Sequence, residues 1–295
     1  MIEFTRFASD MPGQRLLILG SIHGNEPCGT IAIRRLIEAI HEQKISLKRG
    51  VLTLAPNCNP NAYALKRRYV EHNLNRAFRR HTDPTYYEHR LMNILCPLLE
   101  ECDVLLDIHS YTAGGPPFAT RGPEETKDRE EAFIRALGIG TMISEFEQVY
   151  ANCGKLLAPD TPAGTTAYAR RFGAIAATIE CGQHDDPNAA GIAYQAIENA
   201  MAFCKLTDGA AFKPAENFQR IKLAQVRYRD PGQDFVKPWK HMEQIAAGEV
   251  IARQAGAADI EAPFDCFIVM PHLHCPVGEE WYYLGVEETP PADSA

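Results

Sequence analysis

Four short stretches of this 295-residue chain carry residue types that could bind a metal ion and move protons. The first is GSIHGNEP at residues 20–27, in which His23 and Glu26 lie three positions apart. Imidazole nitrogens and carboxylate oxygens are ligands that zinc accepts, so both side chains could reach one ion. A His-x-x-Glu spacing also arises by chance, and a hydrogen bond from His23 to a loop carbonyl is the alternative interpretation.

The surroundings of this stretch predict a turn between a strand and a helix. Residues 16–19 form an apolar run of the length of a buried strand, and an apolar periodicity continues from Pro27 to about His41. Proline is favoured at the first position of a helix. We therefore expect His23 and Glu26 at the carboxyl end of a sheet, where α/β proteins bind their ligands.

Two further apolar runs end in residues of the same chemical kind. Residues 103–108 lead into His109, with Asp107 just before it, and residues 174–179 lead into Glu180. His109 would complete a His, Glu, His set with an open fourth position for water, which is the arrangement of catalytic zinc. Asp107 would either orient an imidazole or cap the backbone. Glu180 would either act as general base and acid or cap the following loop.

The fourth stretch is the basic, amide-rich loop RYVEHNLNR at residues 68–76. A guanidinium group can hold a carboxylate through two parallel hydrogen bonds, or polarise a carbonyl and stabilise an oxyanion. Arg68 and Arg76 are the candidates, and Lys66 and Arg67 leave the choice of the first cation open. The alternative is that these side chains are only solvated.

Strand and helix patterns alternate over the first two-thirds of the chain, which favours an α/β fold with helices on both faces of a sheet. Strands are expected at 16–19, 51–55, 103–108 and 174–179, and helices at 30–41, 84–101, 124–137, 165–171 and 189–206. After about residue 208, short alternating segments punctuated by Pro and Gly favour a small, barrel-like β-rich domain. We expect a catalytic domain at 1–210 and a C-terminal domain at 211–295.

Composition narrows the class of protein. The hydrophobic share of 45% and charged share of 23% are ordinary for a soluble globular protein. A net charge of −8 argues against a nucleic-acid binder. We find no run long enough to span a membrane and no signal-peptide pattern at the N-terminus, so no membrane partner is expected. Nine cysteines without a framework spacing fit reduced thiols and a cytoplasmic protein. Assembly into a homo-oligomer is left open.

In this order, the four stretches resemble the succinylglutamate desuccinylase/aspartoacylase family, which is related to the zinc carboxypeptidases. The resemblance spans about residues 16–182. It implies a zinc-carboxypeptidase-like mixed sheet flanked by helices, with an appended C-terminal domain. It also implies one zinc ion per chain, held by His23, Glu26 and His109. Glu180 would then be the catalytic acid and base, and Arg68 would polarise the scissile carbonyl.

The resemblance also implies how a substrate would be held. Asn75 and Arg76 would bind a substrate carboxylate. Arg170, ten residues before Glu180, matches an arginine that helps aspartoacylase to bind a second carboxylate, with Arg171 as the alternative. The family's C-terminal tyrosine has two candidates here, Tyr282 and Tyr283. The metal-like stretch HLHC at 272–275 lies in a proline-bounded turn, and we expect no metal there.

These inferences predict a zinc-dependent amidohydrolase that removes the acyl group from a small carboxylate substrate, an N-acyl amino acid. Its water would be activated by zinc and Glu180, and Arg76 with Arg170 would favour acidic substrates. A metallocarboxypeptidase acting on short or peptidoglycan-derived peptides is the second hypothesis, because the same constellation serves both reactions. A non-enzymatic module that binds an anionic ligand is the third, and an intact Glu180 argues against it.

Overall fold

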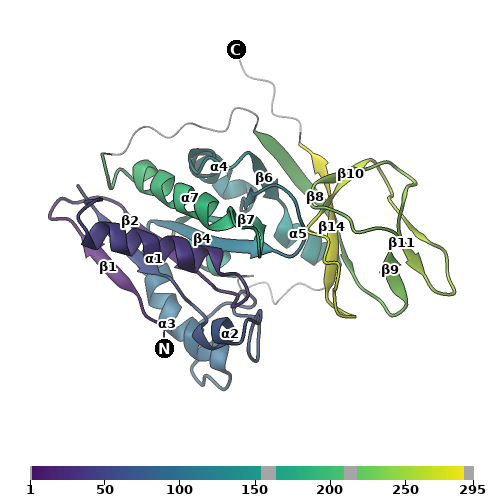
Figure 1. Ribbon diagram of the computed structural model, residues 1–295, viewed down its shortest axis with the longest axis horizontal. Coiled ribbons are helices and arrows are strands. Elements are labelled where there is room, and N and C mark those ends of the chain that lie inside the picture. The colour runs from purple at the N-terminus through teal and green to yellow at the C-terminus, as the bar shows by residue number, and fades with distance from the viewer. Residues whose placement is uncertain (1, 154–163, 209–217, 289–295) are drawn as a thin grey trace, which may run out of the picture.

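The computed structural model describes residues 2–153, 164–208 and 218–288 (Figure 1). An 11-stranded mixed sheet has the strand order β1-β3-β2-β4-β7-β5-β6-β8-β14-β13-β10, and a 3-stranded sheet has the order β12-β11-β9. The strands are β1 (Thr5–Ala8), β2 (Arg15–Gly20), β3 (Val51–Ala55), β4 (Val104–Tyr111), β5 (Phe118–Thr120), β6 (Thr141–Ser144), β7 (Ile175–Gln183), β8 (Gln219–Tyr228), β9 (Gln233–Phe235), β10 (Glu243–Ile245), β11 (Val250–Gln254), β12 (Ile260–Glu261), β13 (Cys266–Val269) and β14 (Glu280–Glu287).

Helices cover both faces of the first part of the large sheet. They are α1 (Cys28–His41), α2 (Pro60–Ala64), α3 (Tyr87–Glu101), a short 3-10 helix η1 (Glu124–Thr126), α4 (Lys127–Ala136), α5 (Phe146–Asn152), α6 (Thr165–Arg170) and α7 (Ala189–Phe203). Helices α1, α4 and α7 contribute to the apolar core on one face, with α1 and α7 side by side (Figure 1). Helices α3 and α6 contribute to the core on the other face. The predicted α/β class is confirmed.

Four neighbouring parallel strands, β3, β2, β4 and β7, form the centre of this architecture. Every residue of β4 is buried, because β2 and β7 flank it and helices cover both of its faces. A strand buried on both faces is mostly apolar, which explains the run that made β4 recognisable; its buried polar residues Asp107, His109 and Ser110 lie toward its carboxyl end. The carboxyl ends of β2, β4 and β7 meet at one edge of the sheet, and in that register His109 lies beside Glu180.

The C-terminal part is rich in β-strands, as expected, and it is continuous with the large sheet. Strand β8 pairs in parallel with β6, with Gln219 opposite Thr141, and β14, β13 and β10 follow in antiparallel pairing. Strands β9 and β11 lie at the right of Figure 1 and pair with β12 in the small sheet. These three strands pack with β10, β13 and β14 around a separate apolar cluster that contains both tryptophans, Trp239 and Trp281. The domain boundary expected at residue 210 lies outside the described residues.

Several elements were not indicated by the sequence pattern. Strands β1, β5 and β6 have only three or four residues, too few for alternation to stand out. Helix α2 lies between the expected strand at 51–55 and the loop at 68–76, where no helix was expected. It forms because Asn59 caps it, accepting a hydrogen bond from the Ala62 amide, and Pro60 starts it. All nine cysteines are unpaired. Within the described residues, no helix combines the length and apolarity needed to cross a bilayer.

Candidate metal centre and active-site cleft

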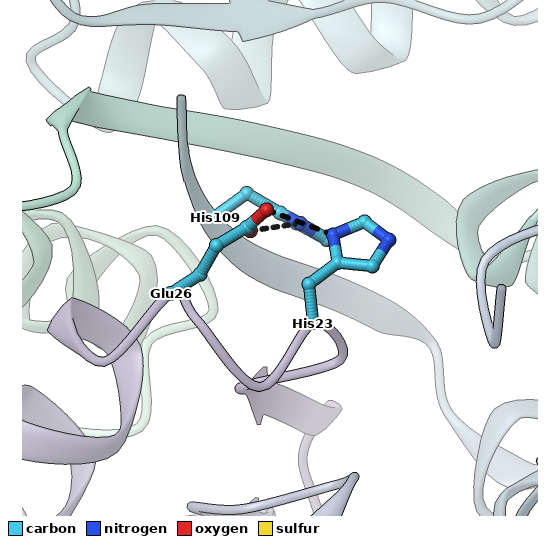
Figure 2. Close-up of side chains that lie close together, drawn as sticks. All are labelled: His23, Glu26 and His109. Carbon is cyan, nitrogen blue, oxygen red and sulfur yellow. Dashed lines mark hydrogen bonds and ion pairs between the residues drawn. The ribbon is translucent and has the colours of Figure 1, made fainter. Parts of the chain in front are cut away.

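His23, Glu26 and His109 converge at the carboxyl edge of the parallel strands (Figure 2). One ligand atom from each lies within 4.8 Å of the others, and all three residues are buried. The Glu26 carboxylate lies between the two imidazoles. Its Oε1 is 2.9 Å from Nδ1 of His23, and its Oε2 is 2.8 Å from Nδ1 of His109. Two imidazole nitrogens and a carboxylate, two of these groups from the loop after β2 and one from β4, could therefore hold a metal ion.

The loop after β2 has a backbone that aims His23 and Glu26 at the end of β4. Ser21 has a positive φ of 46°, and its hydroxyl donates to the carbonyl of Glu26 at 3.0 Å. Gly24 is required for close approach, because a Cβ there would lie 2.1 Å from the carbonyl carbon of Ala62 in α2. Gly24 therefore lets the loop pack tightly on α2.

The Nε2 nitrogen of each imidazole, which points away from Glu26, lies close to an oxygen atom. Nε2 of His23 is 3.0 Å from Oδ1 of Asn73, and Nε2 of His109 is 3.0 Å from Oδ2 of Asp107. The hydroxyl of Thr165 also donates to this oxygen of Asp107. Metal-binding histidines usually donate their second N–H to such an oxygen, which fixes the tautomer and the ring orientation. Of the two roles considered for Asp107, the geometry supports orientation of an imidazole.

The electrostatics of the group also suit a cation. Burial and, to a smaller extent, the charge of Arg68 lower the pKa of His23 to about 4 although Glu26 opposes them, so this imidazole is neutral near pH 7. Burial alone would raise the pKa of Glu26, but the two imidazoles hold it well below its ordinary value. Burial opposes protonation of His109, yet Asp107 and Glu26 raise its pKa. A metal ion would displace that proton from His109 and take its place between the same groups.

Glu180 lies beside the ligands on β7, directly opposite His109 on β4. Its Oε2 is buried and has no hydrogen-bond partner among the described residues. Burial raises the pKa of Glu180 to about 8; Glu26 adds to the rise, whereas His109 and Arg68 oppose it. A buried carboxyl group without a partner is costly, and perturbed groups of this kind cluster at functional sites. The alternative role as a loop cap has no supporting hydrogen bond among the described residues.

The loop at 68–76 forms a wall of the cleft. Arg68 donates from Nη1 to Oε1 of Glu26 at 3.0 Å, and its side chain is 42% exposed. Asn75 accepts a hydrogen bond from the Thr165 amide at 2.9 Å. Arg76 donates from Nη2 to both carboxylate oxygens of Glu280, at 2.9 and 2.8 Å. The charge of Arg76 is therefore compensated by a residue of the C-terminal part.

Arg170 is compensated in the same way. Its Nε is 2.6 Å from Oε1 of Glu130, which is completely buried, and its Nη2 donates to the carbonyl of Ala176 at 3.0 Å. Arg171 is exposed. Of the two neighbouring arginines, Arg170 is thus the one that faces the protein, and a second substrate carboxylate would meet a guanidinium already paired with Glu130.

These groups surround a cleft of about 390 Å³. Seven of the eight predicted site residues line it: His23, Arg68, Asn75, Arg76, His109, Arg170 and Glu180. Glu26 lies buried beneath them. His272 and His274, the metal-like pair of the C-terminal turn, belong to no comparable ligand group among the described residues.

Sequence reasoning did not find Tyr150 and Glu280 in the cleft wall, and it left Tyr283 as one of two candidate tyrosines. The Tyr283 hydroxyl donates to Oε2 of Glu280 at 3.1 Å and lies 2.6 Å from the hydroxyl of Tyr150. Tyr282 packs in the apolar cluster around Trp281 instead. The cleft tyrosine of the two candidates is therefore Tyr283. Tyr150 and Glu280 left no local signal, because α5 and β14 meet only in the folded chain.

Comparison with known proteins supports the same relationship. The profile of the succinylglutamate desuccinylase/aspartoacylase catalytic domain matches residues 12–203. The chain belongs to this family. A probable aspartoacylase from Prochlorococcus marinus is 30% identical over 105 residues, which cover 34% of this chain and 34% of that protein. The match thus spans about a third of the curated relative.

Two solved structures show the shared fold. The succinylglutamate desuccinylase/aspartoacylase from Rhodobacter sphaeroides has a TM-score of 0.76 at 17% identity, covering 97% of this chain and 89% of that chain. The product-bound ectoine utilization protein EutE from Ruegeria pomeroyi also has a TM-score of 0.76, at 20% identity, with the same shares of the two chains covered. The likeness extends through the C-terminal β-strands, since nearly the whole chain is covered.

Proposed function

We propose that this member of the family is a zinc-dependent deacylase that hydrolyses the amide bond of an N-acyl amino acid. The observation that carries the proposal is the convergence of four buried side chains, His23, Glu26, His109 and Glu180. Two imidazoles turn Nδ1 toward Glu26 and Nε2 toward oriented oxygens, and the unpaired carboxyl of Glu180 lies beside them. Structural metal sites have no use for an adjacent unpaired carboxyl group, whereas hydrolysis requires one.

The donor set fits zinc, which accepts nitrogen and oxygen ligands and leaves a fourth position open when three come from the protein. When bound, the ion would lower the pKa of a water molecule and polarise the substrate carbonyl. One ion per chain is expected, because the described residues contain one such ligand group. Asn73 and Asp107 would keep both imidazoles in the tautomer that presents Nδ1 to the ion.

The chain's own residues would carry the proton and the developing charge. Glu180 would take a proton from the attacking water and return it to the departing amine nitrogen. A pKa raised by burial suits this double role, because the group can then hold a proton near neutral pH. Arg68 extends from the cleft wall toward Glu26 and would stabilise the oxyanion of the tetrahedral intermediate.

Asn75 and Arg76 remain our candidates for binding the substrate's α-carboxylate, and Arg170 for binding a second one. Their surroundings refine that proposal. Glu280 already pairs with Arg76, and Glu130 already pairs with Arg170. A compensated guanidinium attracts an added carboxylate less strongly, so we expect only a modest preference for acidic N-acyl amino acids.

A hydrolysis screen of the zinc-loaded protein tests the function. Amine release would be measured with N-acetyl and N-succinyl amino acids and with short peptides. Glu180→Gln is the matched control, because it keeps the size of the side chain but cannot act as a base. We expect the parent to turn over N-acyl amino acids. In Glu180→Gln the turnover should fall by about 10²–10⁴-fold while the zinc content stays unchanged.

The alternatives give different results in the same screen. Cleavage of peptides without cleavage of N-acyl amino acids would identify a metallocarboxypeptidase. Anion binding without any turnover would identify a binding module and refute the proposal of an enzyme. Normal turnover in Glu180→Gln would mean that another group moves the proton.

A further inference from the structure

The loop at residues 68–76, which we call the cleft loop, donates backbone hydrogen bonds to a single buried carboxylate in α3. Glu88 is completely buried in the first turn of that helix. Its Oε1 accepts hydrogen bonds from the amide of Val70 at 2.8 Å and from Nδ2 of Asn59 at 3.3 Å. Its Oε2 accepts from the amides of Glu71 at 3.2 Å and His72 at 3.1 Å. Three consecutive backbone N–H groups thus point at one side chain.

The anchored amides lie between the residues that the proposed reaction uses. Arg68 is two positions before Val70, the first anchored residue. The carbonyl of Arg68 accepts a hydrogen bond at 3.2 Å from the amide of Gly24, in the loop that carries His23 and Glu26. Asn73 follows the last of them, and its side chain contacts His23 and accepts from the amide of Asn75 at 2.9 Å. A shift of the anchored segment would therefore move both the oxyanion-stabilising arginine and the residue that orients a ligand.

The attachment is reciprocal. The side chain of Glu71 accepts a hydrogen bond from the amide of Tyr87 at the start of α3, and the hydroxyl of Tyr87 accepts one from the amide of Asn61. The loop and the helix start therefore hold each other. Glu88 does not line the cleft and cannot touch a substrate, so any effect it has on the reaction must act through the loop.

We propose that Glu88 is a positioning residue that fixes the loop at 68–76 so that Arg68 and Asn73 face the metal centre. This inference rests on the proposed function of the cleft. All four partners of Glu88 are donors, so both of its oxygens must accept. A glutamine of the same size would present an NH₂ group to at least one of these N–H groups, leaving a buried donor unsatisfied.

The test compares Glu88→Gln with Glu101→Gln, an exposed position on the same helix that forms an ion pair with Arg6. We expect Glu88→Gln to keep its zinc, because no ligand is altered, and to lose about 10–100-fold in kcat/KM, as catalytic groups misplaced by about 1 Å do. Amide hydrogen exchange at residues 70–72 should accelerate in the same variant. Glu101→Gln should match the parent in all three measurements.

A double-mutant cycle separates positioning from general stability. In an Arg68→Ala background, Glu88→Gln should cost much less in kcat/KM than in the parent, because the main group that the loop delivers is already missing. Glu88→Asp keeps the charge but shortens the side chain, so it should lose less activity than Glu88→Gln. If Glu88→Gln does not fold, Glu88→Asp takes its place in the cycle. A merely structural role would lower the melting temperature and leave the two losses additive.

Two negative results are distinguishable. A parent protein that hydrolyses no amide refutes the proposed function. An active parent, with zinc-loaded Glu88→Gln within twofold of it in kcat/KM or with unchanged exchange at residues 70–72, refutes only the role of Glu88.

Discussion

Acidic pH should lower the free energy of unfolding through His241, a buried histidine that lies where the C-terminal strands meet the first part of the chain. The ring of His241 packs against Tyr111 and Phe118, with centroids 4.9 and 4.7 Å apart. Its Nδ1 accepts a hydrogen bond from the amide of Met270, and its backbone amide donates to the carbonyl of Gly114. No described group pairs with Nε2, which is buried. Burial alone lowers the pKa of His241 to about 3.

The sign and size of the effect follow from proton linkage. An unfolded chain protonates a histidine at a pKa of about 6.5, so between pH 6.5 and 3 the unfolded state binds more protons than the folded state. The stabilisation is complete above pH 6.5 and is lost as the pH falls toward the folded pKa. At pH 5.0 the two pKa values give a loss of about 2 kcal/mol from this residue.

The assay compares the parent with His241→Gln, which cannot titrate but keeps an oxygen that can accept from the Met270 amide. Urea unfolding would be followed by tryptophan fluorescence at pH 7.5 and 5.0. Both tryptophans, Trp239 and Trp281, are buried in the C-terminal part, so the signal reports on that part. The parent's free energy of unfolding should fall by about 2 kcal/mol more than that of the variant. An equal fall in both proteins would refute the reasoning.

Two further predictions concern the site. His109→Ala removes one of the three proposed ligands, so elemental analysis should show a large loss from the expected stoichiometry of about one zinc per chain; undiminished zinc in a folded variant would exclude His109 as a ligand. Arg170→Ala leaves Glu130 buried without its counter-ion, so the variant should lose about 3–5 kcal/mol of stability. If it instead keeps its stability and loses kcat/KM only on acidic substrates, Arg170 selects substrates rather than supporting the fold.

The His23, Glu26 and His109 group was predictable because its residues follow or lie near the carboxyl ends of strands that the apolar runs in the sequence already indicated. His23 and Glu26 follow one buried strand, and His109 and Glu180 lie near the carboxyl ends of two others, which continue to Tyr111 and Gln183 rather than ending at residues 108 and 179 as expected. Parallel strands bring their carboxyl ends to the same edge, so an apolar run followed by a polar residue already implies convergence. The C-terminal strands were predictable for a similar reason, since proline and glycine mark their ends.

The partners of the charged residues could not be predicted in this way. Arg170 was visible as a cation, but its pairing with Glu130 joins α6 to α4 across 40 positions. Glu88 looked like an acidic residue in the first turn of a helix, which is common for electrostatic reasons alone. Its burial and its four donors depend on how the cleft loop packs on α3, and no spacing in the sequence encodes that contact.

The pairing of β6 with β8 has a consequence for the order in which the enzyme is assembled during synthesis. All three proposed metal ligands lie within the first 109 residues, whereas Glu280 and Tyr283, which complete the cleft wall, are on β14. Chains fold from the N-terminus as they emerge from the ribosome. The metal-binding group can therefore form on a growing chain, but the substrate cleft closes only after β8 and β14 have joined the sheet. Metal capture would thus precede competence for hydrolysis, and an unfinished chain would hold its ion without acting on a substrate.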